Sequence, residues 1–184
     1  MIFIRINKTG STSVATFVKG FCDTFQINKF NQRVDRAGGW LDRERIKNQE
    51  CFTVVRNPFK RAISCYNHCI RLGNIYTFVQ WLEKDFTEMS PKERVHSIRQ
   101  VDFLRDSRDS IEWVNYILKL EDENLESKIK SLTGAVGELP HDGKGCYSED
   151  EKIYYSDSYA KELVKSKYYL DFKTFGYEIK EFDI

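Results

Sequence analysis

A polar stretch of seven residues, Asn7 to Ser13, directly follows a short apolar run at the front of the chain. It brings together the ammonium group of Lys8, the small residue Gly10 and several hydroxyl side chains. Because apolar residues recur at helical spacing from Val14 onward, a helix is expected to begin inside this stretch. Its first backbone N–H groups and the positive end of its dipole would face the loop, where a phosphate or sulfate group can bind. The residues predicted to contact such a group are Lys8, Thr9, Gly10, Ser11, Thr12 and Ser13.

This loop differs from the standard P-loop pattern, in which Gly and four further residues precede Gly-Lys-Ser/Thr. Here Lys8 comes before Gly10, and the loop is shorter. A plainer alternative is that Ser11 or Ser13 only caps the helix and that Lys8 is solvated. We favour the anion site, because lysine, glycine and hydroxyls are clustered directly after a buried type of strand.

A second polar turn follows the apolar segment from residue 51 to residue 55. It begins with Arg56-Asn57, and Pro58 is well suited to the first turn of a following helix. The guanidinium of Arg56 can form paired hydrogen bonds with phosphate oxygens. Ser64 lies eight residues further on, in the helix that is expected to follow Pro58. The alternatives are a surface ion pair for Arg56 and a solvated position for Ser64.

The order strand, polar loop, helix therefore occurs twice, at Lys8 and at Arg56. Such units build a parallel sheet with helices on both faces, and ligands bind at the C-terminal ends of its strands. We predict an α/β fold, a P-loop-like three-layer sandwich with a small central parallel sheet flanked by helices, in one domain over residues 1–184. A further strand is expected near residues 25–27, and a strand or buried segment near 113–118. Further helices are expected near 43–48, 77–86, 124–132 and 159–167, and a solvated basic face at Lys60 and Arg61.

The charge of the chain is unevenly distributed. Residues 1–72 hold 13 Lys and Arg against 5 Asp and Glu, whereas residues 73–184 hold 16 against 23. A basic first part suits a small polyanionic ligand. Nucleic acid is not expected as a partner, because no basic helix interleaved with aromatic residues and no known nucleic-acid motif is present.

Membrane and metal signals are weak. No apolar run reaches the length of a membrane span, and the first strand leaves no room for a signal peptide, so a cytoplasmic location is expected. The five cysteines lack paired CxxC spacing. Cys65 and Cys69 lie four apart beside His68, but two further zinc ligands are not evident, so we expect reduced, packed thiols and no metal.

The two loops together resemble the sulfotransferase superfamily, specifically its carbohydrate sulfotransferase type, called family 2. Asn7–Ser13 is similar to the family's 5′-phosphosulfate loop, and Val54–Tyr66 is similar to its 3′-phosphate motif. Weaker similarities follow in the right order, so that the resemblance covers almost the whole chain. His96, Gln100 and Phe103-Leu104 resemble a His…Gln…Leu segment of the family. Leu120–Leu125 resembles its Glu-Asn-Leu turn, and Asp171–Tyr177 resembles its closing Asp-Phe…Phe-Gly-Tyr segment.

The resemblance implies transfer of a sulfuryl group from 3′-phosphoadenosine 5′-phosphosulfate (PAPS) to an acceptor hydroxyl, by family a carbohydrate hydroxyl. The residue chemistry agrees, since in an in-line displacement Lys8 is placed to stabilise the leaving phosphate oxygen. Arg56 and Ser64 would hold the 3′-phosphate. No Asp pair suited to Mg²⁺ follows either strand, and a sulfuryl group carries less charge than a phosphoryl group, so a metal is not required.

The base that accepts the proton of the hydroxyl is not evident. By alignment, Trp40 lies near the position where many relatives have His, and its side chain cannot accept a proton. The candidates are His96 and Asp35, ranked equally, with Glu44 behind them. A lone His is also often a structural residue, and Trp40 is interpreted as stacking on a sugar ring or filling the core.

Two other functions stay open on the sequence alone. One is a metal-dependent nucleotide or sugar kinase of P-loop ancestry, which the absent Walker spacing disfavours. The other is a non-catalytic module that binds PAPS or its product, adenosine 3′,5′-bisphosphate, and has lost the base. The oligomeric state and the acceptor are not determined by the residues.

Overall fold

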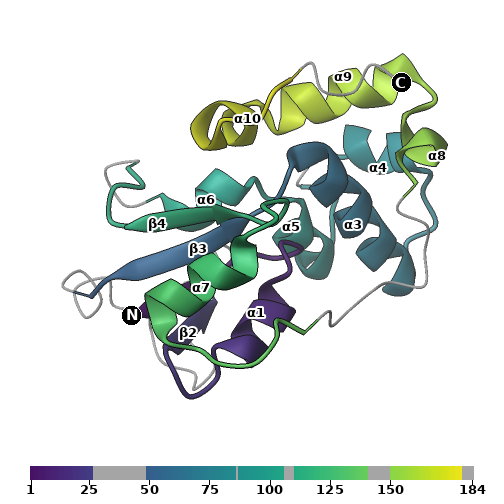
Figure 1. The fold of residues 1–184 in the computed structure, drawn as a ribbon. Helices are drawn as coiled ribbons and strands as arrows, with labels where there is room; N and C mark the ends of the chain where they lie inside the picture. Colours follow the sequence, from purple (N-terminus) through teal and green to yellow (C-terminus); the bar gives the residue numbers. More distant parts are fainter. Residues whose placement is uncertain (27–48, 86, 106–109, 141–149, 180–184) are drawn as a thin grey trace. The chain divides into compact units, whose positions relative to one another are not determined.

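The computed structural model describes residues 1–26, 49–85, 87–105, 110–140 and 150–179 (Figure 1). These residues form two compact units, each of which is built from two segments of the chain. The first unit comprises residues 1–56 and 102–144, and the second comprises residues 57–101 and 145–184. The single domain predicted over residues 1–184 stays a prediction.

The first unit contains a parallel sheet of four strands in the order β2-β1-β3-β4. In the register of its two inner strands, Phe3 lies opposite Phe52. This arrangement confirms the predicted α/β fold with a small central parallel sheet flanked by helices. The elements of the unit are β1 (Ile2–Arg5), α1 (Ser11–Phe17), β2 (Asp23–Gln26), β3 (Cys51–Val55), β4 (Tyr116–Lys119) and α7 (Leu125–Thr133).

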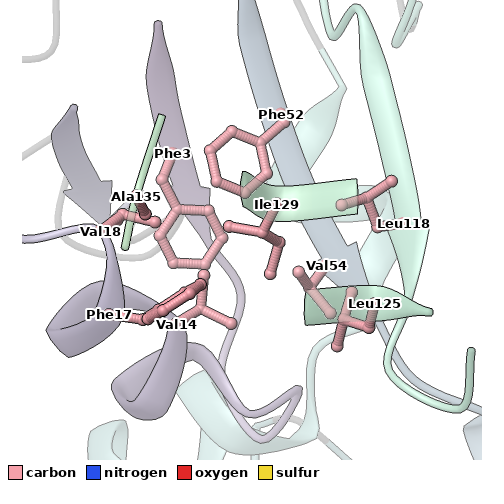
Figure 2. Packing of buried hydrophobic residues seen from close by; sticks show 10 residues of the cluster. All are labelled: Phe3, Val14, Phe17, Val18, Phe52, Val54, Leu118, Leu125, Ile129 and Ala135. Carbon is pink, nitrogen blue, oxygen red and sulfur yellow. The ribbon is translucent and has the colours of Figure 1, made fainter. Parts of the chain in front are cut away.

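Helices α1 and α7 cover one face of this sheet. Phe3 and Phe52 stack there with their ring centroids 4.9 Å apart (Figure 2). Because side chains alternate along a strand, every second residue of β1 and β3 faces these helices. Their apolar stripes complete a core whose buried members are Phe3, Val14, Phe17, Val18, Phe52, Val54, Leu118, Leu125, Ile129 and Ala135.

The second unit is helical in the part that the structure describes. Its core contains edge-to-face aromatic pairs, such as Phe59 with Tyr155 and Tyr66 with Phe78. The helix expected over residues 77–86 ends at Glu83. The elements are α3 (Pro58–Arg71), α4 (Phe78–Glu83), α5 (Pro91–Ser97), α8 (Glu151–Tyr155), α9 (Ser158–Lys167) and α10 (Tyr169–Phe175), while α6 (Gln100–Leu104) begins in this unit and ends in the first.

A buried carboxylate connects two segments of the second unit. Asp171 is fully buried and accepts hydrogen bonds from the backbone N–H groups of Gln100 at 2.8 Å and of Val101 at 2.9 Å. Burial raises the pKa of Asp171, and the charge of Arg61 and the backbone hydrogen bonds oppose that rise. The carboxylate thus caps the start of α6.

Arg61 corrects the prediction of a solvated basic face. Lys60 is exposed as predicted, but only 1% of Arg61 is accessible to solvent. Its guanidinium donates to the backbone carbonyl of Ile98 at 2.8 Å. Arg61 lies on the inner side of α3 and donates to a carbonyl of the same unit, whereas Lys60, one residue earlier, is exposed.

Candidate functional site

The turn between β1 and α1 has a strained backbone. Lys8 has φ 69° and Gly10 has φ 71°, both in the left-handed region. This conformation costs a residue with a side chain about 1–2 kcal/mol, and such strain is concentrated at functional sites. The hydroxyl of Thr9 donates to the carbonyl of Ile6 at 3.0 Å and holds the turn together. A lysine is therefore kept in an unfavourable conformation at the C-terminal end of a buried strand.

The helix start also corrects the capping alternative. The N-cap residue of α1 is Gly10, and Ser11 is already the first helical residue. Glycine has no side chain that could accept a hydrogen bond from the first turn of α1. Neither Ser11 nor Ser13 is the N-cap, and both are buried within the turn. The hydroxyl of Thr12 is on an exposed residue.

Gly10 also lies close to a side chain from another loop of the first unit. A Cβ atom at this position would lie 2.8 Å from Cδ1 of Leu120, the residue that follows β4. The backbone of Leu120 is held to β3, since its N–H donates to the carbonyl of Val55 at 2.8 Å. The loop after β4 thus packs against the loop after β1. Leu120 belongs to the family-like segment Leu120–Leu125, but no pattern in the sequence indicates this contact.

Arg56 lies at the same edge of the sheet as Lys8. It directly follows β3, which is the parallel neighbour of β1, so the two polar turns leave the sheet at the same ends of adjacent strands. Asn57 accepts hydrogen bonds at Oδ1 from the backbone N–H groups of Phe59 at 2.9 Å and Lys60 at 3.4 Å, and so caps α3. This cap fixes the point at which the chain turns after Arg56. The Asn-Pro dipeptide at a helix start is the signal that predicts it.

The other predicted residues lie in the second unit or outside the described ranges. Ser64 is on α3 and is buried. His96 is in the last turn of α5, and the centroid of its ring is 4.0 Å from that of His68. The structure therefore brings Lys8 and Arg56 to one sheet edge, while His96 packs against another imidazole within the helical unit. Asp35 lies outside the described residues, as do Trp40 and Glu44.

Arg5 was not singled out by sequence analysis. It is the last residue of β1, only 8% exposed, and its Nη2 atom lies 3.5 Å from the hydroxyl oxygen of Thr12. Strand alternation is the signal that could have found it. Phe3 faces α1, and a cation two residues later must face the same side.

The downstream segments are structural where the structure describes their contacts. Gln100, from the His…Gln…Leu segment, and Asp171, from the closing segment, are hydrogen-bonded to each other over 71 residues of chain. The cysteines described are free thiols, and burial raises the pKa of Cys22 to about 11. Within the described ranges, no group of three or more His, Cys, Asp or Glu could hold a metal ion. None of the helices in those ranges is both long and apolar enough to cross a bilayer.

Comparison with known proteins identifies the family. A family model described as the sulfotransferase family matches residues 1–178, nearly the whole chain. No curated protein and no solved structure matches the chain. The chain therefore belongs to the sulfotransferase family and is a transferase enzyme.

Proposed function

We propose that this member of the sulfotransferase family takes PAPS as its donor and a carbohydrate hydroxyl as its acceptor. The observation that carries the proposal is the pair of cationic turns at neighbouring strand ends, the strained turn at Lys8 and the capped turn at Arg56. A donor with an anionic group at each end of its ribose needs two such positions. Family membership supports sulfuryl transfer in general.

The residues present suit the transfer step. The acceptor oxygen forms a bond to sulfur, the bond between sulfur and the 5′-phosphate oxygen breaks, and adenosine 3′,5′-bisphosphate leaves. Negative charge develops on the leaving oxygen, where the ammonium of Lys8 and the first backbone N–H groups of α1 stabilise it. Arg56 holds the 3′-phosphate through its paired donors, assisted by Ser64 on α3.

The proton of the acceptor hydroxyl goes to a general base. His96 and Asp35 are the proposed candidates, because each can accept a proton and neither belongs to the donor turns. Replacing whichever residue is the general base, by His96→Ala or Asp35→Asn, is expected to lower the rate of sulfuryl transfer strongly. Binding of adenosine 3′,5′-bisphosphate should stay unchanged. If both variants keep full activity, Glu44 is the next residue to replace.

Calorimetry with three nucleotides tests the donor. A charge-assisted hydrogen bond to phosphate contributes roughly 1.5–3 kcal/mol, and about 1.4 kcal/mol is tenfold in affinity. Adenosine 3′,5′-bisphosphate should therefore bind at least about tenfold more tightly than AMP. Arg56→Ala should remove most of that preference and leave AMP binding nearly unchanged, whereas the exposed Lys60→Ala serves as the matched control.

Two results would contradict the proposal. Equal affinity for AMP and adenosine 3′,5′-bisphosphate would show that the protein has no binding position for the 3′-phosphate. A clear preference for ATP with Mg²⁺ would instead indicate a kinase. Turnover with a radiolabelled sulfuryl donor and a panel of glycans then separates an enzyme from a binding module.

A further inference from the structure

We propose that Arg5 is a second cationic residue of the donor loop, a positioning residue that acts on the 5′ group of the donor through Thr12 and through its own buried charge. The inference rests on the proposed function, and it deepens that function by assigning a residue to one end of the nucleotide. It starts from three observations on Arg5, namely its position in β1, its burial and its contact with Thr12.

The position of Arg5 follows from the strand. It is the last residue of β1 and lies two residues after Phe3, so both side chains point to the face that α1 and α7 cover. Figure 2 shows Phe3 directed toward Val14 and Phe17 of α1. Arg5 therefore lies on the side of the sheet where α1 begins, two residues closer to the loop than Phe3 of the apolar core.

The contact with Thr12 spans the loop. Nη2 of Arg5 lies 3.5 Å from Oγ1 of Thr12, and the two residues are seven positions apart. One residue precedes the strained turn at Lys8, and the other is the second residue of α1. The contact thus joins the two ends of the loop that is proposed to hold the 5′ group. It also orients the hydroxyl of Thr12, which is an exposed residue.

The charge of Arg5 adds a second reason. A guanidinium stays protonated at any physiological pH, and only 8% of Arg5 is exposed. Charges interact more strongly where water is largely excluded, so a buried cation acts on an anion beyond direct contact. Arg5 and Lys8 would then share the negative charge of the 5′ group.

A purely structural role is the competing interpretation. In that case Arg5 only fastens α1 to the sheet, and its replacement lowers stability without preference for any ligand. The two interpretations differ in which nucleotide is affected. A residue that acts on the 5′ group must matter for 5′-AMP and must not matter for 3′-AMP, which has no phosphate at that end.

The experiment therefore compares three ligands by calorimetry, namely adenosine 3′,5′-bisphosphate, 5′-AMP and 3′-AMP, on the full chain. Arg5→Met should weaken binding of the first two by at least about tenfold and leave 3′-AMP unchanged. Arg5→Lys should fall between parent and Arg5→Met, because it keeps the charge and loses the planar fork. Lys19→Met is the matched control, since Lys19 is exposed and lies just beyond the end of α1.

Thr12→Val supplies a second route if Arg5→Met does not fold. It removes the hydroxyl from an exposed position and should weaken 5′-AMP severalfold while leaving 3′-AMP unchanged. The proposal is overturned if Arg5→Met weakens all three ligands equally or none of them. It is also overturned if neither Arg5→Lys nor Thr12→Val changes 5′-AMP binding. Failure of the proposed function has a different signature, because the parent protein would then show no preference for the bisphosphate over AMP.

Discussion

The starts of α1 and α6 face the same electrostatic problem and meet it in different ways. At the start of α6 the chain supplies its own anion, because the carboxylate of Asp171 accepts hydrogen bonds from the backbone of Gln100 and Val101. At the start of α1 the N-cap is Gly10, which has no side chain to offer, and the preceding turn carries Lys8 instead of an acid. The start of α6 therefore has a charged acceptor from within the chain, whereas the start of α1 is where the proposed function puts the anionic 5′ group of the donor.

The comparison extends to the end of a helix. The ammonium of Lys167 donates to the backbone carbonyls of Leu82 at 3.0 Å and Lys84 at 3.3 Å, at the C-terminal end of α4. This cation satisfies the negative end of the helix, as Asp171 satisfies the positive start of α6. Side chains that stabilise helix ends from within serve folding. The turn at Lys8 departs from that pattern, because it has a lysine and a glycine N-cap where a structural cap would have an acceptor side chain.

The largest effect is expected for Lys8→Ala. If the turn at Lys8 is built for a developing negative charge, removing the ammonium should slow transfer by about 10²–10³. The unfolding transition should stay nearly unchanged, because alanine and lysine have the same conformational strain at a positive φ. Steady-state turnover with saturating donor measures the loss, with Lys19→Ala as the control. Turnover at the parental rate would show that Lys8 does not stabilise the leaving group.

Asp171→Ala should show the opposite behaviour. It leaves two buried backbone N–H groups without their charged acceptor and should cost about 3 kcal/mol of stability. The affinity of the remaining folded protein for adenosine 3′,5′-bisphosphate should not change. Urea denaturation combined with calorimetry separates the two quantities. A specific loss of nucleotide affinity in a stably folded variant would break the distinction between the two helix starts.

Gly10→Ala tests the strained turn itself. Alanine at φ 71° is expected to cost about 1–2 kcal/mol, and its Cβ would also displace Leu120. Nucleotide affinity should fall together with stability. Adding Leu120→Ala restores the space but not the conformation, so the double variant should recover only part of the loss. Full recovery in thermal unfolding and calorimetry would show that packing alone, and not the backbone conformation, requires glycine.

The smallest effect is a pH dependence at Lys167. Burial lowers the pKa of this lysine to about 8 in the folded chain. Above that pH the unfolded chain binds more protons than the folded one, so stability should rise with pH toward the unfolded pKa. Between pH 8 and 9 the contribution is about 1 kcal/mol.

Lys167→Met should abolish this contribution. Burial raises the pKa of Cys22 and Cys51, which acts in the opposite direction as pH rises, so the relevant quantity is the difference between parent and variant at each pH. Urea denaturation at pH 8 and pH 9 measures it. An identical pH dependence in both proteins would show that the ammonium is not buried at the end of α4 as described.

Much of the fold could be predicted because its signals are local. The apolar runs before Lys8 and Arg56 predict β1 and β3, and Pro58 marks the start of α3. Two strand–loop–helix units imply a parallel sheet, and parallel strands place both polar turns at one edge. The Lys8 and Arg56 turns follow from these short patterns, since each depends on residues within about ten positions of one another.

The remaining features depend on which distant segments become neighbours, and no local pattern encodes that. The sequence beside Lys60 predicts that Arg61 is a surface residue. Its buried guanidinium instead donates a hydrogen bond to the carbonyl of Ile98, 37 residues away. Asp171 caps a helix that begins 71 residues earlier, and a Cβ atom at position 10 would lie 2.8 Å from Cδ1 of Leu120, 110 residues further along the chain. Burying a charge costs free energy unless a hydrogen-bonding or oppositely charged partner lies beside it. The packing of the whole chain determines which residue becomes that partner.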